Sequence, residues 1–281
     1  MRASPGCSSR CSGPCAIPRQ SRTSAELVLT FDNLGEATEL ERGGRPSSVG
    51  AHPSVTEALP WLLDALEACG LRATFFLEAI NCELYPEAVR SIAERGHELG
   101  MHGWRHEEWS SLSIARERSI LERCVEAFSS FGLSVSGFRP PGGELTRASV
   151  GLLRSVGVRW CSPVGEDFGV SDGLTWVPFE WDLVDAYYLM ESFADLRVLR
   201  GDSRVVMPAG TLAARFRGAV RSVARDRRQA TLILHPFLML DPAWREGVGE
   251  LLAEIGALAR AGELWVGPGG ALAVRAGEPS A

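Results

Sequence analysis

Two histidines in the segment HGWRH are the side chains of this sequence best suited to bind a metal ion. His102 and His106 lie four residues apart, and the chain has five histidines in all. If the chain turns helical after His102, both imidazoles project from one face and reach the same ion. The alternative is two unrelated polar residues at the start of a helix. An oxygen ligand from another segment would favour the metal site.

Three further ionisable residues end apolar segments. Asp32 follows LVLTF, Arg139 follows Phe138 and precedes two prolines, and His235 ends TLIL. An arginine on a stiff backbone suits a bidentate contact with a carboxylate, and a histidine at a pocket mouth suits proton transfer. Each also has a plain alternative: a turn cap for Asp32, an exposed loop for Arg139, and a satisfied core group for His235.

The apolar pattern alternates between strands and helices, which predicts parallel strands with helices outside. About seven such units favour a closed or nearly closed α/β barrel, whose catalytic groups sit at the carboxyl ends of the strands. The expected strands are 26–31, 72–77, 97–102, 136–139, 157–161, 174–179 and 231–235, and the expected helices are 54–69, 86–95, 113–131, 147–155, 209–227 and 243–261.

Five short motifs, in order, resemble those of the polysaccharide deacetylases (the NodB-homology family, carbohydrate esterase family four). The resemblance spans roughly residues 26–236 and implies a deformed (β/α) barrel of about seven strands. HPSV and WDLVDAYY look closer to the branch with allantoinase-like and peptidoglycan-deacetylase-like proteins. The five motifs are FDN at 31–33, HGWRH at 102–106, RPPGG at 139–143, EWD at 180–182 and LILHP at 232–236.

The resemblance also implies roles in hydrolysing a C–N amide bond. Asp32 would be the general base that activates water, and Arg139 would orient it. His102 and His106 would hold a divalent metal, usually zinc, which polarises the acyl oxygen. His235 would be the general acid that protonates the leaving amine.

Four residues near the motifs are candidates for contact with substrate. Asp182 would support the acid or line the pocket, and Pro140 belongs to the arginine motif. The rings of Trp181 and Trp104 could stack on a sugar or a flat heterocycle, and packing in the barrel is the alternative for both.

One position departs from the family pattern. The second aspartate of the first motif, the usual third metal ligand, is here Asn33. A neutral amide oxygen is a weaker zinc ligand than a carboxylate. Three outcomes follow: Asn33 binds the metal, Glu36 replaces it, or the site works without metal. We expect a divalent metal, zinc first, on His102, His106 and Asn33.

Three functions remain open. The first is removal of an acetyl or formyl group from an amino sugar or small metabolite. The second is metal-independent hydrolysis of a cyclic imide or ureide. The third is a catalytically silent binding module, which Asn33 suggests and the retained Asp32, Arg139 and His235 oppose.

Composition bounds the remaining expectations. A net charge of −6 without a basic stripe argues against nucleic-acid binding. No apolar run is long enough to span a membrane, and residues 1–24 lack the apolar core of a signal peptide. We expect a disordered tail over 1–24, one catalytic domain over 25–275, a cytoplasmic location and a soluble small-molecule or glycan substrate. The sequence does not predict an oligomeric state.

Overall fold

The computed structural model describes residues 24–44 and 49–277. The tail expected over residues 1–24 therefore lies outside the described residues, except for Ser24. In the described ranges, no helix is both long enough and apolar enough to cross a membrane.

One mixed sheet forms the centre of the protein. Its order is β6-β7-β5-β4-β3-β2-β1-β8, with β9 also paired to β1. All pairs are parallel except β6 with β7. The described strands are β1 Glu26–Asp32, β2 Thr74–Leu77, β3 Glu98–Met101, β4 Gly137–Phe138, β5 Trp160–Cys161, β6 Gly169–Ser171, β7 Leu174–Trp176, β8 Gln229–Leu234 and β9 Trp265–Gly267.

Every residue of strand β1 is buried. Parallel strands covered on both faces consist of continuous apolar runs rather than an alternating pattern, and LVLTF is such a run. Hydrogen bonding to β2 on one side and to the edge strand β8 on the other places the end of β1 between the ends of these two strands.

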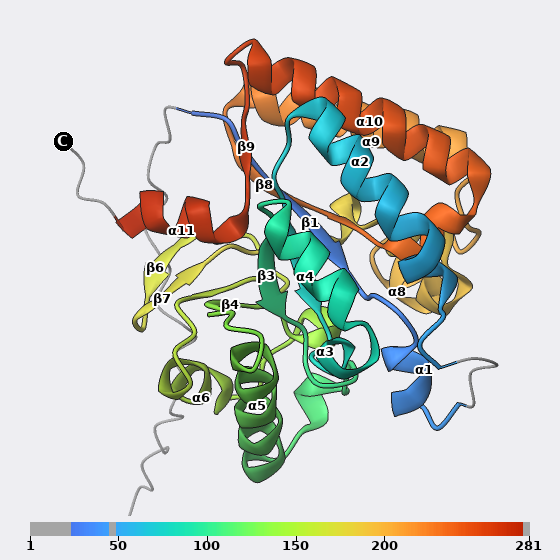
Figure 1. Ribbon diagram of the computed structural model, residues 1–281. Coiled ribbons are helices and arrows are strands. Elements are labelled where there is room, and N and C mark those ends of the chain that lie inside the picture. The colour runs from blue at the N-terminus through green and yellow to red at the C-terminus, as the bar shows by residue number, and fades with distance from the viewer. Residues whose placement is uncertain (1–23, 45–48, 278–281) are drawn as a thin grey trace, which may run out of the picture.

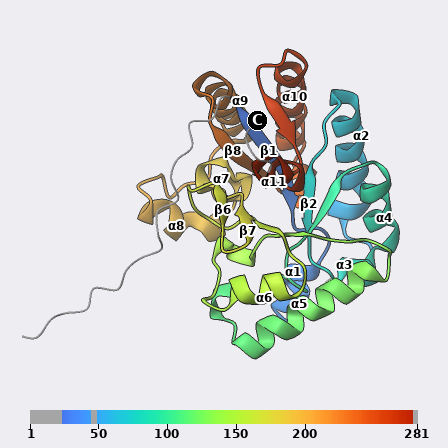
Figure 2. The ribbon, with the colours of Figure 1, turned by 90° about the vertical axis from the view of Figure 1, so that its left-hand side faces the viewer.

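Helices cover the outer face of the curled sheet. Figure 1 shows α2, α9 and α10 side by side, and Figure 2 shows α5 and α6 at the opposite end of the molecule. The helices are α1 Ala37–Glu41, α2 Leu59–Cys69, α3 Asn81–Leu84, α4 Pro86–Glu94, α5 Ile114–Ser129, α6 Ser149–Ser155, α7 Asp185–Leu189, α8 Ala194–Leu199, α9 Ala209–Asp226, α10 Pro242–Arg260 and α11 Gly269–Gly277.

The expected helix over 54–69 forms in two parts. A π-helical turn, Ser54–Ala58, leads into α2. Gly70 ends α2 in the left-handed conformation at φ 68°. Ser54 is the first residue of the π-helical turn, and its hydroxyl accepts from Gly35 N.

Helix α11 packs against the amino ends of the strands (Figure 1). Gly269 N donates to Thr74 Oγ1 and Gly270 N donates to Glu98 Oε2, and these acceptors begin β2 and β3. Leu272 of α11 joins a separate apolar cluster that includes Trp160. This end of the sheet is therefore filled, which leaves the carboxyl ends of the strands for a functional site.

The structure confirms the deformed α/β barrel. The sheet curls, but the ladder does not close between its edge strands β6 and β8. A single parallel bridge joins Val184 to Ile233 of β8. This contact brings the segment after Trp181 against the last strand of the barrel.

Candidate active site

A cavity of about 420 Å³ lies at the carboxyl ends of β1, β3, β4 and β8, near α1. Each strand delivers a polar residue at its end: Asp32 closes β1, His102 follows β3, Arg139 follows β4 and His235 follows β8. All four line the cavity together with Asn33 and His106. The structure thus brings together the six residues that the sequence assigns to chemistry.

Arg139 fixes the Asp32 carboxylate. Its Nη1 donates to Asp32 Oδ1 at 2.6 Å and to Thr30 Oγ1 at 2.8 Å, and its Nη2 donates to Ser162 Oγ at 2.8 Å. The guanidinium is only 1% exposed and lies 4.2 Å from the centre of the Phe76 ring. Because one carboxylate oxygen is committed to Arg139, Oδ2 remains for the cavity, 3.9 Å from His102 Nε2.

The two histidines of HGWRH face each other, with ring centres 4.9 Å apart. His102 Nδ1 donates to Arg139 O at 2.9 Å, which leaves the Nε2 lone pair for the cavity. Burial lowers the pKa of His102 to about 3 and the pKa of His106 to about 3. Both imidazoles are therefore neutral near pH 7, the form that binds metals.

The helical turn considered between these two histidines does not form. Gly103 and His106 both have positive φ, 76° and 70°, so the segment is a loop. The buried Glu107 stabilises it, because Oε2 accepts from Trp104 N at 2.9 Å and from Arg105 N at 3.2 Å. A tight loop, rather than helical spacing, brings the two rings together.

Trp104 does not line the cavity, so its expected contact with substrate is not supported. Its ring is buried beneath the guanidinium of Arg123, 3.4 Å from the ring centre. Trp181 and Pro140 do line the cavity. Trp181 packs edge to face with Phe179 and beside Phe193, so one wall is aromatic.

The amide nitrogen of Asn33 is engaged by two hydrogen bonds, one to Glu78 and one to Thr38. Nδ2 donates to Glu78 Oε1 at 2.5 Å, while no described residue donates to Oδ1. Glu36, the alternative ligand, is engaged elsewhere: it accepts from the Tyr85 hydroxyl and from Gly50 N. Glu36 therefore stabilises the loop that approaches the cavity, and Asn33 is left as the oxygen donor.

These residues fit a divalent metal of the zinc type. The described ranges contain no cluster of three His, Cys, Asp or Glu side chains able to hold an ion, so the amide oxygen of Asn33, which lines the same cavity, would be the third donor. Two neutral imidazoles and one oxygen are a normal zinc donor set, although the oxygen is usually a carboxylate. The hydrogen bond from His102 to Arg139 O is the outer contact that orients a metal-binding histidine.

The acid support expected at Asp182 belongs to Asp185 instead. Asp185 Oδ1 lies 2.5 Å from His235 Nδ1, and its Oδ2 accepts from His235 N at 2.9 Å. The bridge between Val184 and Ile233 places the next residue, Asp185, beside the end of β8. Asp182 does not line the cavity, and its Oδ1 is buried without a hydrogen-bond partner.

The electrostatics of His235 follow from this contact. Burial alone would lower its pKa, but the charge and hydrogen bond of Asp185 outweigh burial and raise the pKa above its usual value. His235 therefore differs from the two metal-site histidines: it is suited to carry and donate a proton.

Sequence reasoning missed three residues around the cavity. Asp185 and His52 lie in the segments WDLVDAYY and HPSV, whose likeness to one branch of the family was the available signal. His52 also lines the cavity, with Nδ1 2.8 Å from Ser54 Oγ. No pattern in the sequence pointed to Glu78, because it follows an apolar strand and belongs to none of the motifs.

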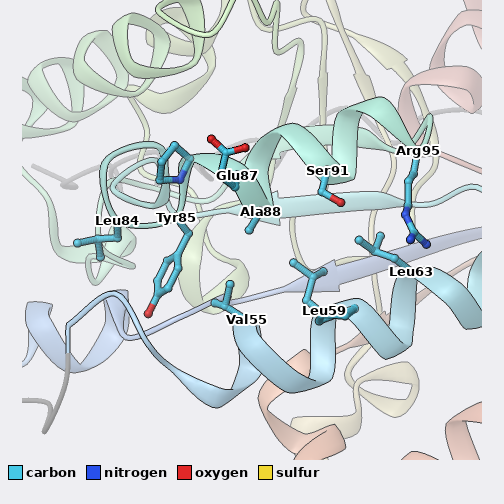
Figure 3. A pocket seen from close by; sticks show the side chains of 11 residues that line it. Val55, Leu59, Leu63, Leu84, Tyr85, Glu87, Ala88, Ser91 and Arg95 are labelled. Carbon is cyan, nitrogen blue, oxygen red and sulfur yellow. The ribbon is translucent and has the colours of Figure 1, made fainter.

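A second cavity of about 440 Å³ lies between α2 and α4 (Figure 3). Leu59 and Leu63 line it from α2, and Ala88 lines it from α4. At one end, Arg95 is paired with Asp64 at 2.6 Å. Its lining is largely apolar and holds none of the residues assigned to chemistry, so the chemistry belongs to the first cavity.

A curled α/β barrel with an Arg–Asp pair, two neutral histidines and a His–Asp pair at its strand ends defines a class of hydrolase-like proteins. The sequence profile of the polysaccharide deacetylases matches residues 19–161, about half of the chain. The chain belongs to the polysaccharide deacetylase family.

Relatives and solved structures agree with this assignment. A peptidoglycan-N-acetylglucosamine deacetylase from Bacillus cereus is 32% identical over 122 residues, 43% of this chain and 38% of the relative. Chitin deacetylase 1 from Saccharomyces cerevisiae is 34% identical over 88 residues, 31% and 29% of the two chains. The matches thus cover well under half of these curated relatives.

Two solved structures superpose over nearly the whole chain. A Mycobacterium smegmatis protein of the polysaccharide deacetylase type is 25% identical, with 94% of each chain covered and a TM-score of 0.76. The Puue allantoinase is 15% identical, with 96% of each chain covered and a TM-score of 0.72. At that identity the allantoinase shows a shared fold only.

Proposed function

We propose that this protein hydrolyses the C–N amide bond of an N-acyl compound, releasing a small acid such as acetate or formate. The observation that carries the proposal is one cavity holding Asp32 clamped by Arg139 and His235 paired with Asp185. Base and acid are thus separate groups with opposite surroundings, as amide hydrolysis requires.

Each side chain has a definite task in this proposal. Asp32 takes a proton from the attacking water through Oδ2, while Arg139 holds Oδ1. His235 donates a proton to the departing amine, which leaves poorly as an anion. His102, His106 and Asn33 would hold the divalent metal, which when bound supplies a Lewis acid for the acyl oxygen.

We propose a small or sugar-like substrate. A cavity of about 420 Å³ is within the size range of small-molecule sites. Phe179 and Trp181 offer flat apolar faces, whereas His52 and Thr38 offer polar atoms on the lining. An amino sugar has both kinds of surface, and so has a compact N-acyl metabolite.

The test is release of acetate or formate from a panel of N-acetyl and N-formyl amino sugars and amines. Asp32→Asn should lower kcat/KM by about 10²- to 10⁴-fold, because the general base is lost while the shape is kept. Asp226→Asn, an exposed substitution of the same kind, should leave it unchanged. Retained activity in Asp32→Asn would show that another group is the base.

Metal-independent opening of a cyclic imide or ureide is the second candidate. The neutral Asn33 in the metal site and the aromatic wall, which suits a flat ring, favour it. Ring opening without release of a small acid, and unaffected by a chelator, would replace the first proposal with this one. Turnover of neither substrate class would leave the binding module.

A further inference from the structure

The side chain of Glu78 is a buried carboxylate at the edge of the site. It is fully buried directly after β2 and has three N–H groups around it. Asn33 Nδ2 donates at 2.5 Å, Leu34 N at 3.3 Å and Asn81 Nδ2 at 3.3 Å. Among the described residues, no cationic side chain lies within ion-pair distance of it. Burial raises the pKa of Glu78 to about 8, whereas the N–H donors around it favour its ionised form.

The contact with Asn33 determines what the amide presents to the cavity. With Nδ2 bonded to Glu78 and Thr38, Oδ1 is the side-chain atom of Asn33 to which no described residue donates, and Asn33 lines the cavity with His102 and His106. A rotated amide would place Oδ1 against the carboxylate, and two acceptors at that distance repel. The carboxylate therefore selects one orientation of the amide.

We infer that Glu78 is a positioning residue that presents Asn33 Oδ1 to the cation held by His102 and His106. The inference rests on the metal site of the proposed function. A carboxylate bonded to the amide N–H polarises the amide and strengthens its oxygen as a donor, which is the role of outer-sphere partners in metal sites.

The pair explains why position 33 is an amide. An aspartate there would put two carboxylates at hydrogen-bond distance in a buried place, and both cannot remain ionised. The roles can instead be exchanged. In Asn33→Asp with Glu78→Gln, the carboxylate becomes the ligand and the amide becomes its partner, at the same total charge.

The experiment measures metal binding rather than turnover. The full chain is stripped with chelator and titrated with Co²⁺ and Zn²⁺, using calorimetry and visible absorption of the Co²⁺ form. Glu78→Gln should weaken binding by about 10- to 100-fold, as loss of an outer partner does elsewhere. Glu98→Gln is the control, because Glu98 is a partly buried carboxylate bonded to Thr74 and Trp160 at the far end of the sheet.

The exchange variant keeps the test decisive if Glu78→Gln folds poorly. Asn33→Asp alone should bind no better than the native chain, and adding Glu78→Gln should restore binding to the native level or above. Native-level binding by Glu78→Gln, or tighter binding by Asn33→Asp alone than by the exchange variant, overturns the inference. So does a native chain that binds neither ion.

Acetate release, followed in parallel, separates this inference from the proposed function. The expected order of metal affinities without any acid release would keep Glu78 as a positioning residue and overturn the deacylase. Acid release by a chain that binds neither ion would keep the deacylase and overturn the role of Glu78 as a positioning residue.

Discussion

At the scale of single residues, the site separates three histidines by their surroundings. Burial keeps His102 and His106 neutral, whereas Asp185 raises the pKa of His235. In the proposed function the same side chain thus serves as a metal ligand in two places and as a proton donor in a third. A carboxylate within 2.5 Å makes the difference.

Asp185→Asn tests that difference. The general acid must be protonated, so a raised pKa keeps it active to higher pH; without the Asp185 charge the pKa of His235 falls. The alkaline limb of kcat/KM should move to lower pH, with about a tenfold or larger loss on that limb. Asp182→Asn should leave the profile in place. An unmoved limb in Asp185→Asn would assign the acid elsewhere.

At the scale of elements, the short loop after β3 delivers both imidazoles. It needs the left-handed backbone at Gly103, where a Cβ would come within 2.6 Å of Glu107 Oε2. That oxygen accepts the hydrogen bonds that shape the loop. The shape of this loop therefore determines whether the two imidazoles can hold the proposed metal together.

Gly103→Ala should disrupt this loop. A left-handed alanine costs about 1–2 kcal/mol, and the clash with Glu107 should add metal loss, seen as lower Zn²⁺ stoichiometry by elemental mass spectrometry. Gly132→Ala is the control: Gly132 has φ 71° but nothing within 4 Å of an added Cβ. It should show the strain in urea unfolding and keep its metal. Equal metal uptake by both variants would separate the loop from the site.

At the scale of the whole molecule, burial of neutral histidines should make the fold sensitive to acid. His97, which directly precedes β3, has its pKa lowered to about 4 by burial and by the nearby Arg72 and Arg95. Its Nδ1 accepts from Ala73 N at 3.3 Å, a contact that requires an unprotonated nitrogen.

The sign of the effect follows from the two pKa values. Below pH 6.5, the usual pKa of histidine, His97 takes up a proton in the unfolded chain. In the folded chain it stays neutral until about pH 4, because its pKa is lowered to about 4. Stability is therefore full above pH 6.5 and is lost as pH falls toward 4, by up to ~1.4 kcal/mol per pH unit. Urea unfolding at pH 7 and pH 5 should show a smaller loss for His97→Gln than for the native chain. Parallel losses in the two chains would contradict this.

The sequence by itself determined the α/β alternation and placed the candidate catalytic residues at the strand ends. Asp32, Arg139 and His235 each interrupt an apolar run, and parallel strands bring their carboxyl ends to one edge. Local order along the chain therefore carries enough information to gather these residues in one place. The order of the motifs along the chain also indicated the family. The location of the protein in the cell stays a prediction.

Only the tertiary structure decided which groups support that site. Asp185 rather than Asp182 reaches His235 because one bridge sets the register of two segments 50 residues apart. Glu78 meets Asn33 across 45 residues because β1 and β2 are neighbours. Such contacts depend on how elements pack against one another, and local patterns in a single sequence contain no record of that packing.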